Sequence, residues 1–202
     1  VILYLFSTSI GEILTISFAI FLGYPLPILA TQIIWLNLVT DGFLDVALAM
    51  EPKEQNLLAG GFKKPAKYIV DSLMLQRMFF MALPMAIGTL FMFKKYLSAD
   101  IIKASTISLT VLAVFQWFNA WNCRSENKSI LQLNIFSNKF LLGATSIVVG
   151  LQICAVYLPW MQKILHTVSL DFKDWLFVIS IAFSIILIEE ARKFFYRRLQ
   201  LN

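Results

Sequence analysis

The chain has 202 residues, of which 59% are hydrophobic and 14% are charged, and its formal net charge is +5. This composition excludes an ordinary soluble domain, in which charged residues make up about a quarter of the chain. No stretch rich in Pro, Gly or Ser separates two parts of the sequence, so we expect one all-α membrane domain over residues 1–202.

Apolar stretches that approach the bilayer-spanning length, about 20 helical residues, recur along the chain. They predict helices at approximately 1–22, 28–50, 75–93, 107–122, 140–158 and 175–188. The turn GYPLP at 23–27 joins the first two helices, because proline at these positions resists a continuous helix. The sequence therefore predicts a six-helix transmembrane bundle that begins with an antiparallel hairpin.

Basic residues fall unevenly on the two sides of this bundle. Twelve lie in or beside the 51–74 loop, the 123–139 loop and the 189–202 tail, and five lie on the other side, which together account for all 17 Lys and Arg. Cytoplasmic loops carry the excess of Lys and Arg, so we expect the 51–74 loop and the C-terminal tail to be cytoplasmic. The positive charge then follows from topology and anionic lipid headgroups, and needs no nucleic acid partner.

The start of the chain lies inside an apolar run. It begins with Val1 rather than an initiator Met, and neither a charged n-region nor a small-residue cleavage site marks a signal peptide. We therefore expect the sequence to be cut from a longer polypeptide. The compact outer loops fit an integral, multi-pass protein of a plasma (cell) membrane, and an organelle stays open as the alternative.

The second predicted helix carries four polar residues in the otherwise apolar segment that begins at residue 37: Asn37, Thr40, Asp41 and Asp45. A carboxylate at mid-depth in a membrane helix costs about 2.5–3.5 kcal/mol on insertion scales, and it persists where it faces protein and binds something positive. Residues three and four apart share a helical face, so these side chains are expected on one side of the helix. Gly42 weakens the helix and predicts an unwound turn with free carbonyl oxygens.

Glu12 on the first helix is expected at a similar depth to Asp41. At 1.5 Å per residue, Glu12 lies about 16 Å and Asp41 about 21 Å from the outer turn. Two ionised carboxylates at this depth would repel unless a proton or a cation lies between them. Oxygen ligands suit hard cations, Ca²⁺ before Mn²⁺ or Na⁺. Further polar side chains occur near them on the first and fourth helices: Ser7, Thr8, Ser9, Gln116, Asn119 and Asn122.

Several segments together resemble P-type cation-transporting ATPases, closest to the calcium-pump branch. STSIGEI at 7–13, QIIWLNLVTDG at 32–42 and ALAMEP at 47–52 are similar to helices five and six of those pumps. SENKS at 125–129 and the stretch from LDFKDWL to EEARKF at 170–194 extend the resemblance. It covers essentially the whole chain as a C-terminal transmembrane domain, helices five to ten.

This resemblance implies a set of metal ligands. In calcium pumps helices five, six and eight supply them, and the matching positions here are Ser9, Glu12, Asn37, Thr40, Asp41 and Gln116. The family's Asp, here Asp41, is shared between two ion sites. Ser9 stands in place of an Asn and Gln116 in place of a Glu. These replacements remove ligand strength from one of the two sites, so the number of ions bound stays open.

Two further departures leave the ion open. Leu44 replaces a Pro of many relatives, and Asp45 adds a carboxylate where calcium pumps have a small residue. Gln116-Trp117 with Asn119 is also similar to the sodium/potassium branch. Ca²⁺ is the first expectation, with Mn²⁺, Na⁺, K⁺ and H⁺ as alternatives.

The mechanism that the resemblance implies is ATP-driven alternating access, with phosphorylation of a cytoplasmic Asp. The sequence contains neither a DKTG motif nor a GxxxxGK[ST] phosphate loop, so no catalytic or cofactor-binding residue is expected in it. ATP and Mg²⁺ would act through other domains of the same pump. Those N-terminal transmembrane and cytoplasmic domains, together with the lipid bilayer, are the expected partners.

Rival interpretations of the same residues remain. The carboxylates could serve a stand-alone cation channel or secondary carrier as a relay, or the chain could be a non-transporting membrane subunit. Glu12 and Asp41 could also be a structural hydrogen-bonded pair, and Gln116 could join helices without touching an ion. Asp45, near the cytoplasmic end of its helix, fits a mouth-lining acid as well as a ligand.

Overall fold

The computed structural model describes residues 1–52, 72–125 and 128–200, and these form an all-α bundle. The elements, in chain order, are α1 (Ile2–Phe21), α2 (Ala30–Trp35), the π-helical turn η1 (Leu36–Asp41), α3 (Gly42–Ala49), α4 (Ser72–Leu97), α5 (Ile101–Asn122), the 3₁₀ turns η2 (Ile130–Gln132) and η3 (Ile135–Ser137), α6 (Lys139–Tyr157), α7 (Pro159–Leu165) and α8 (Phe172–Gln200). The expected all-α class is confirmed.

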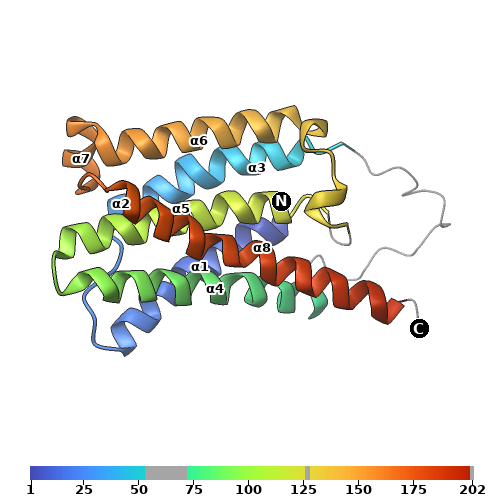
Figure 1. Ribbon diagram of the computed structural model, residues 1–202, viewed down its shortest axis with the longest axis horizontal. Coiled ribbons are helices and arrows are strands. Elements are labelled where there is room, and N and C mark those ends of the chain that lie inside the picture. The colour runs from blue at the N-terminus through green and yellow to red at the C-terminus, as the bar shows by residue number, and fades with distance from the viewer. Residues whose placement is uncertain (53–71, 126–127, 201–202) are drawn as a thin grey trace.

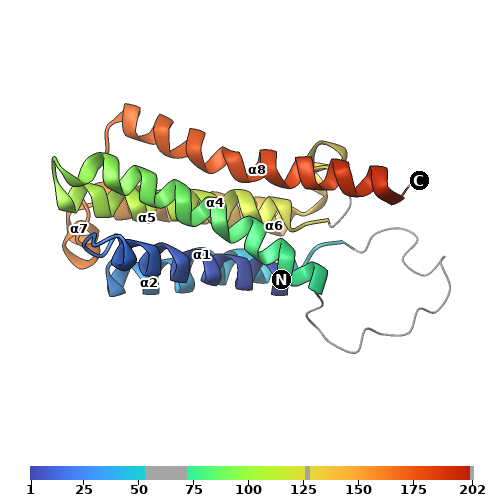
Figure 2. The ribbon, with the colours of Figure 1, turned by 90° about the horizontal axis from the view of Figure 1, so that it is seen from below.

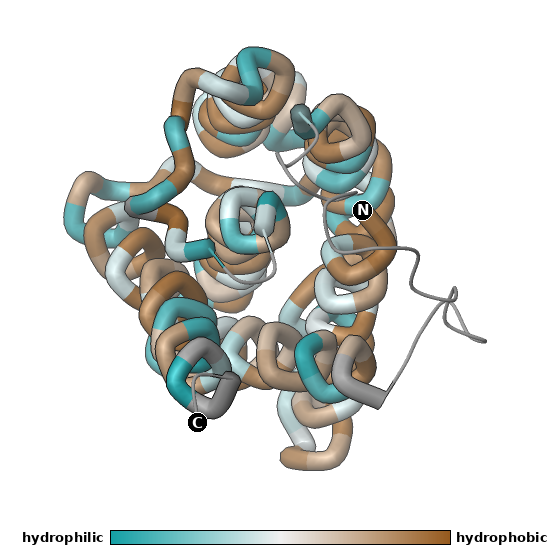
Figure 3. The backbone as a smooth tube through the Cα atoms, turned by 90° about the vertical axis from the view of Figure 1, so that its right-hand side faces the viewer, coloured by the Kyte–Doolittle hydropathy of each residue, from teal (hydrophilic) through white to brown (hydrophobic). Residues whose placement is uncertain are grey.

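Helix α5 lies at the centre of the bundle, as the end-on view in Figure 3 shows. Almost every residue from Ala104 to Asn122 is buried. This helix packs against α4 and α8, while α1 packs against α4 and α3 packs against α6. Figure 1 shows α3 and α6 side by side, with α8 running across the bundle. Because α5 has no side that faces solvent, its polar side chains must find partners on the surrounding helices.

The start of the first helix and the end of the last helix lie at the same end of the bundle. Helix α1 begins and α8 ends at the right-hand end in Figures 1 and 2, where α3 also ends and α4 begins. This arrangement agrees with the expected hairpin order of the first two helical segments. It puts the end of α3 and the start of α4 on the same side as the C-terminal part of α8.

Five helical segments of the described chain are long and apolar enough to cross a membrane: Ile2–Phe21, Ala30–Ala49, Met74–Leu97, Ile101–Asn122 and Lys139–Tyr157. They correspond to the first five predicted spans. Large apolar side chains also point outward, among them Ile87 and Phe91, which are 61% and 62% exposed. Such outward apolar surface needs a nonaqueous environment.

The sixth predicted span, 175–188, lies within α8 but is not among these five segments. Its apolar part is short because Lys173 and Asp174 precede it and Glu189 and Glu190 follow it. A crossing by α8 therefore stays a prediction. The helix itself continues to Gln200, so most of the expected 189–202 tail is helical. Most of the expected 51–74 loop lies outside the described residues.

Helices α4 and α5 are, like α8, longer than predicted. Helix α4 runs from Ser72 to Leu97 and contains Pro84 without ending there. Helix α5 begins at Ile101 rather than 107, because the Asp100 carboxylate accepts a 2.8 Å hydrogen bond from the Ile102 amide and caps its first turn. The sequence interpretation followed hydrophobic length and overlooked this cap.

The expected unwinding at Gly42 is wrong. Gly42 is regular helix, with φ −56° and ψ −47°, and the irregularity is the π turn of η1, which ends one residue earlier at Asp41. A π turn contains an extra residue per turn, so it rotates the side chains that follow it relative to those before it. Asn37, Thr40 and Asp41 therefore lie within the irregular turn itself, and Asp45 follows it in α3.

Candidate cation site

Asp41 is buried against α1, with 1% of its surface exposed. The Tyr4 hydroxyl donates a 2.8 Å hydrogen bond to Asp41 Oδ1, and the Thr8 hydroxyl donates a 3.0 Å bond to Oδ2. Tyr4 and Thr8 are one helical turn apart and so share a face of α1. Both oxygens of a costly buried carboxylate are thereby satisfied by a neighbouring helix.

Glu12, further along α1, is 5% exposed and joins two other elements. The Gln116 side-chain amide on α5 donates to Glu12 Oε1 at 2.9 Å, and the Asn37 amide on η1 donates to Oε2 at 3.3 Å. The two acidic residues therefore lie on facing helices, each held by hydrogen-bond donors from a different helix. They form the polar centre of an otherwise apolar bundle.

The π turn determines which carboxylate each of its residues meets. Asn37, near the start of η1, contacts Glu12 and also donates to the Ile33 carbonyl at 3.1 Å. Asp41, at the end of η1, contacts Tyr4 and Thr8 instead. The two ends of this π turn therefore contact α1 at two different heights along the helix.

The structure joins three of the six predicted ligands, Glu12, Asn37 and Gln116, in one hydrogen-bonded group. A fourth, Asp41, lies in a separate group with Tyr4 and Thr8. Thr40 is buried at 2% exposure and Ser9 is half-buried. Among the contacts of the described residues, neither makes a side-chain hydrogen bond to Glu12 or Asp41. They remain predicted ligands only through the resemblance.

Sequence reasoning did not single out Tyr4 as a partner of Asp41. The signal was available, because Tyr4, Thr8 and Glu12 recur every four residues and so lie on one face of α1. A polar stripe on an apolar membrane helix marks the side that faces protein. A neighbouring contact, from the Asn119 amide to the Ser7 hydroxyl at 2.8 Å, extends this stripe to α5.

Two oxygen atoms near this centre are available for a ligand. Gln116 Oε1 and Asp45 Oδ1 are buried and accept no hydrogen bond from the part of the chain that the structure describes. Asp45 lies one turn beyond Asp41, and its side chain is only half-buried. Carboxylate, amide and hydroxyl oxygens are the ligand types that a hard cation prefers.

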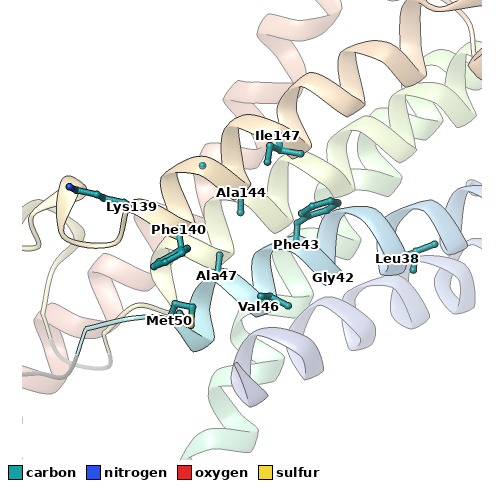
Figure 4. Close-up of a pocket in the computed structure, with 11 residues that line it drawn as sticks. Leu38, Gly42, Phe43, Val46, Ala47, Met50, Lys139, Phe140, Ala144 and Ile147 are labelled. Carbon is teal, nitrogen blue, oxygen red and sulfur yellow. The ribbon is translucent and has the colours of Figure 1, made fainter.

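A cavity of about 600 Å³ lies elsewhere, between α3 and α6. Figure 4 shows that apolar side chains such as Phe43, Val46, Phe140 and Ile147 line it, with Lys139 at one end. No carboxylate lines this cavity, so it is distinct from the cation site.

The family described as "Cation transporting ATPase, C-terminus" matches residues 25–195. Calcium-transporting ATPase 1 of Saccharomyces cerevisiae is 29% identical over 199 residues, which cover 95% of this chain and 20% of the relative. Human calcium-transporting ATPase type 2C member 1 is 31% identical, with 93% of this chain and 21% of the relative covered. A calcium-transporting ATPase of Bacillus subtilis is also 31% identical, with 89% and 20% covered.

The chain thus spans about one fifth of the length of these curated relatives. The similarity extends over nearly all of this chain, so the predicted resemblance is confirmed. The chain belongs to the family of cation-transporting ATPase C-terminal membrane domains.

Proposed function

We propose that this chain is the ion-translocating membrane part of an ATP-driven P-type pump, and that its transported ion is Ca²⁺. The observation that carries the proposal is the pair of buried carboxylates on facing helices, Glu12 and Asp41. The names of the relatives support a calcium pump over a stand-alone channel, a secondary carrier or a non-transporting subunit.

Glu12, Asn37 and Asp41 would provide the main oxygen ligands. Ca²⁺ takes six to eight oxygens, so Thr40, Gln116 and Ser9 are proposed to complete the set when the ion binds, together with segments of the native polypeptide outside this chain. Tyr4, Thr8 and Gln116 donate hydrogen bonds to the carboxylates. Binding would replace the Gln116 donor on Glu12 with the cation, while the Tyr4 and Thr8 donors continue to orient Asp41.

The energy source lies in the rest of the polypeptide. ATP, Mg²⁺ and the phosphorylated Asp would act in cytoplasmic domains, and movement of α1 relative to η1 would open the site to one side of the membrane at a time. The excess of Lys and Arg supports a cytoplasmic C-terminus, and the compact outer loops support a plasma membrane.

The test uses the native polypeptide in membranes, with Ca²⁺-dependent phosphoenzyme formation from radiolabelled ATP as the readout. Asp41→Asn should abolish Ca²⁺ dependence, and Glu12→Gln should weaken it somewhat less. Asp171→Asn is the matched control, because the Asp171 side chain is 83% exposed. Parallel titrations with Mn²⁺, Na⁺, K⁺ and H⁺ identify the ion.

Unchanged Ca²⁺ affinity in Asp41→Asn would overturn the site. A wild-type protein whose phosphorylation ignores Ca²⁺ but follows another of these cations would overturn only the choice of ion. Ion flux without ATP consumption would favour the channel or carrier.

A further inference from the structure

An ion pair lies just beyond the end of α3, the helix that follows Asp41. Arg124, in the connection after α5, donates from Nε and from one terminal nitrogen to the Glu51 carboxylate, at distances of 2.8–3.1 Å. The Arg124 side chain is 1% exposed and that of Glu51 22%. Arg124 also donates to the Ser137 hydroxyl at 2.6 Å. A two-pronged Arg–carboxylate pair of this kind fixes orientation as well as position.

Asn138 reinforces the same junction. Its side-chain amide donates to Glu51 Oε2 at 2.7 Å and to the Ala47 carbonyl at 3.1 Å. The Asn138 side-chain oxygen, Oδ1, accepts a 2.8 Å hydrogen bond from the Leu141 backbone amide, so the same residue caps the start of α6. The Ala47 carbonyl also accepts a 3.2 Å hydrogen bond from the Met50 amide at the end of α3. One side chain therefore ties the last turn of α3 to the first turn of α6.

The opposite end of this interrupted helix is tied as well. On α2, the Gln32 amide donates to the Leu165 carbonyl at 2.9 Å, and its oxygen accepts from Ser105 at 3.0 Å. The π turn with Asp41 therefore lies between two anchored ends. Because α3 is a regular helix from Gly42, rotation of its far end would rotate Asp41, about 9 Å from Ala47 along the axis.

We propose that Arg124, acting through Glu51 and Asn138, is a positioning residue for the cation site. The junction sets the rotation of α3 and so directs the Asp41 carboxylate at α1. Arg124 makes no hydrogen bond to the proposed ligands, so its effect is transmitted by the helix. This inference rests on the proposed function, because the quantity it controls is cation affinity.

The experiment measures the Ca²⁺ concentration for half-maximal phosphorylation in the native polypeptide carrying Arg124→Lys, Arg124→Gln, Glu51→Gln or both Gln substitutions. Lys retains the charge but lacks the planar fork. Each single variant should raise that concentration about 3- to 10-fold, the range for residues that act through a coupled element. The double variant should be no worse than the worse single one, because the pair acts as a unit.

Lys128→Ala is the matched control, since Lys128 is exposed in the same connection. Loss of thermal stability with unchanged half-maximal Ca²⁺ concentration would overturn the proposal and leave Arg124 purely structural. If Arg124→Gln fails to fold, Arg124→Lys decides the matter.

A second measurement does not depend on ion transport. Spin labels at Val46 of α3 and Ile153 of α6, which are 69% and 45% exposed, report the distance between the two helices in a cysteine-depleted background. The distance distribution should broaden or shift in Arg124→Lys and stay unchanged in Lys128→Ala. An unchanged distribution would refute the positioning role, whereas loss of Ca²⁺ dependence in the wild type would refute the proposed function alone.

Discussion

The Tyr4 hydroxyl on α1 donates a 2.8 Å hydrogen bond to the carboxylate of Asp41, at the end of the π turn. Tyr4 is fully buried and Asp41 is 1% exposed. The bond joins the two helical segments that hold the acidic residues of the candidate site. It holds one oxygen of Asp41 while the Thr8 hydroxyl holds the other, so α1 determines the orientation of this carboxylate.

Replacing Tyr4 with Phe tests that role, because it removes the donor and retains the ring. A hydrogen bond to a charged group is worth about 1.5–3 kcal/mol, so we expect Ca²⁺ affinity in the native polypeptide to fall about tenfold or more. The measurement is the Ca²⁺ dependence of phosphoenzyme formation. The control is Tyr24→Phe, in the turn after α1, which should leave Ca²⁺ affinity unchanged. An unchanged Ca²⁺ titration in Tyr4→Phe would show that the Tyr4 hydroxyl does not orient the Asp41 carboxylate for the cation.

Converting Gln116 to Glu should make the stability of the protein more dependent on Ca²⁺. The Gln116 amide is 2.9 Å from Glu12 Oε1, so the new carboxylate would meet an existing one in a buried place. We expect a loss of about 2 kcal/mol without Ca²⁺, reversed when the cation binds. Thermal unfolding with a chelator measures the loss of stability, and thermal unfolding with Ca²⁺ measures its recovery.

Gln116→Met provides the uncharged comparison for that experiment. It should lower stability with the chelator and lower it further relative to wild type with Ca²⁺, because it also removes a proposed ligand. Equal responses of Gln116→Glu and Gln116→Met to Ca²⁺ would argue that Gln116 only joins α5 to α1.

Gly88 on α4 permits a close approach of two other helices. A Cβ at this position would lie 2.8 Å from Ile181 and 2.9 Å from the Phe115 ring. Overpacking costs about 1–3 kcal/mol, which exceeds the helix propensity of about 1 kcal/mol that Ala offers over Gly. We therefore expect Gly88→Ala to destabilise the bundle by about 1–2 kcal/mol, measured by denaturation in detergent.

Gly143 on α6 is the control for this substitution, because a Cβ there meets nothing within 4 Å. Gly143→Ala should be neutral or slightly stabilising. Equal effects of the two substitutions would contradict the close packing of α4 against α5 and α8.

The buried carboxylate of Glu189 should contribute to stability without affecting the cation. It is 3.3 Å from Arg77 on α4 and 2.7 Å from Arg192 on α8. Removing one partner of a buried ion pair costs about 3 kcal/mol, so Glu189→Gln should lower the denaturation midpoint and leave Ca²⁺ affinity intact. Asp171→Asn, at an exposed pair with Lys103, should change stability by less than about 1 kcal/mol. A shift in Ca²⁺ affinity in Glu189→Gln would connect this pair to the site.

The sequence by itself determined the class of the protein, five helical segments that are long and apolar enough to cross a membrane, and the two acidic residues at its centre. Helix length depends on a local run of apolar residues, and a carboxylate inside such a run is visible wherever the chain folds. The NLVTDG segment also identified the family before any contact was known. The predicted ligands Ser9 and Thr40 still rest on that resemblance.

The tertiary structure decided which groups meet. The sequence placed the break in the second helix at Gly42, but the break is the π turn before it, where Asn37 and Asp41 form hydrogen bonds with α1. Tyr4 on Asp41 and Arg124 on Glu51 join residues far apart in the chain. Such contacts depend on helix rotation and crossing, which arise from packing of the whole bundle and leave no local pattern in the sequence.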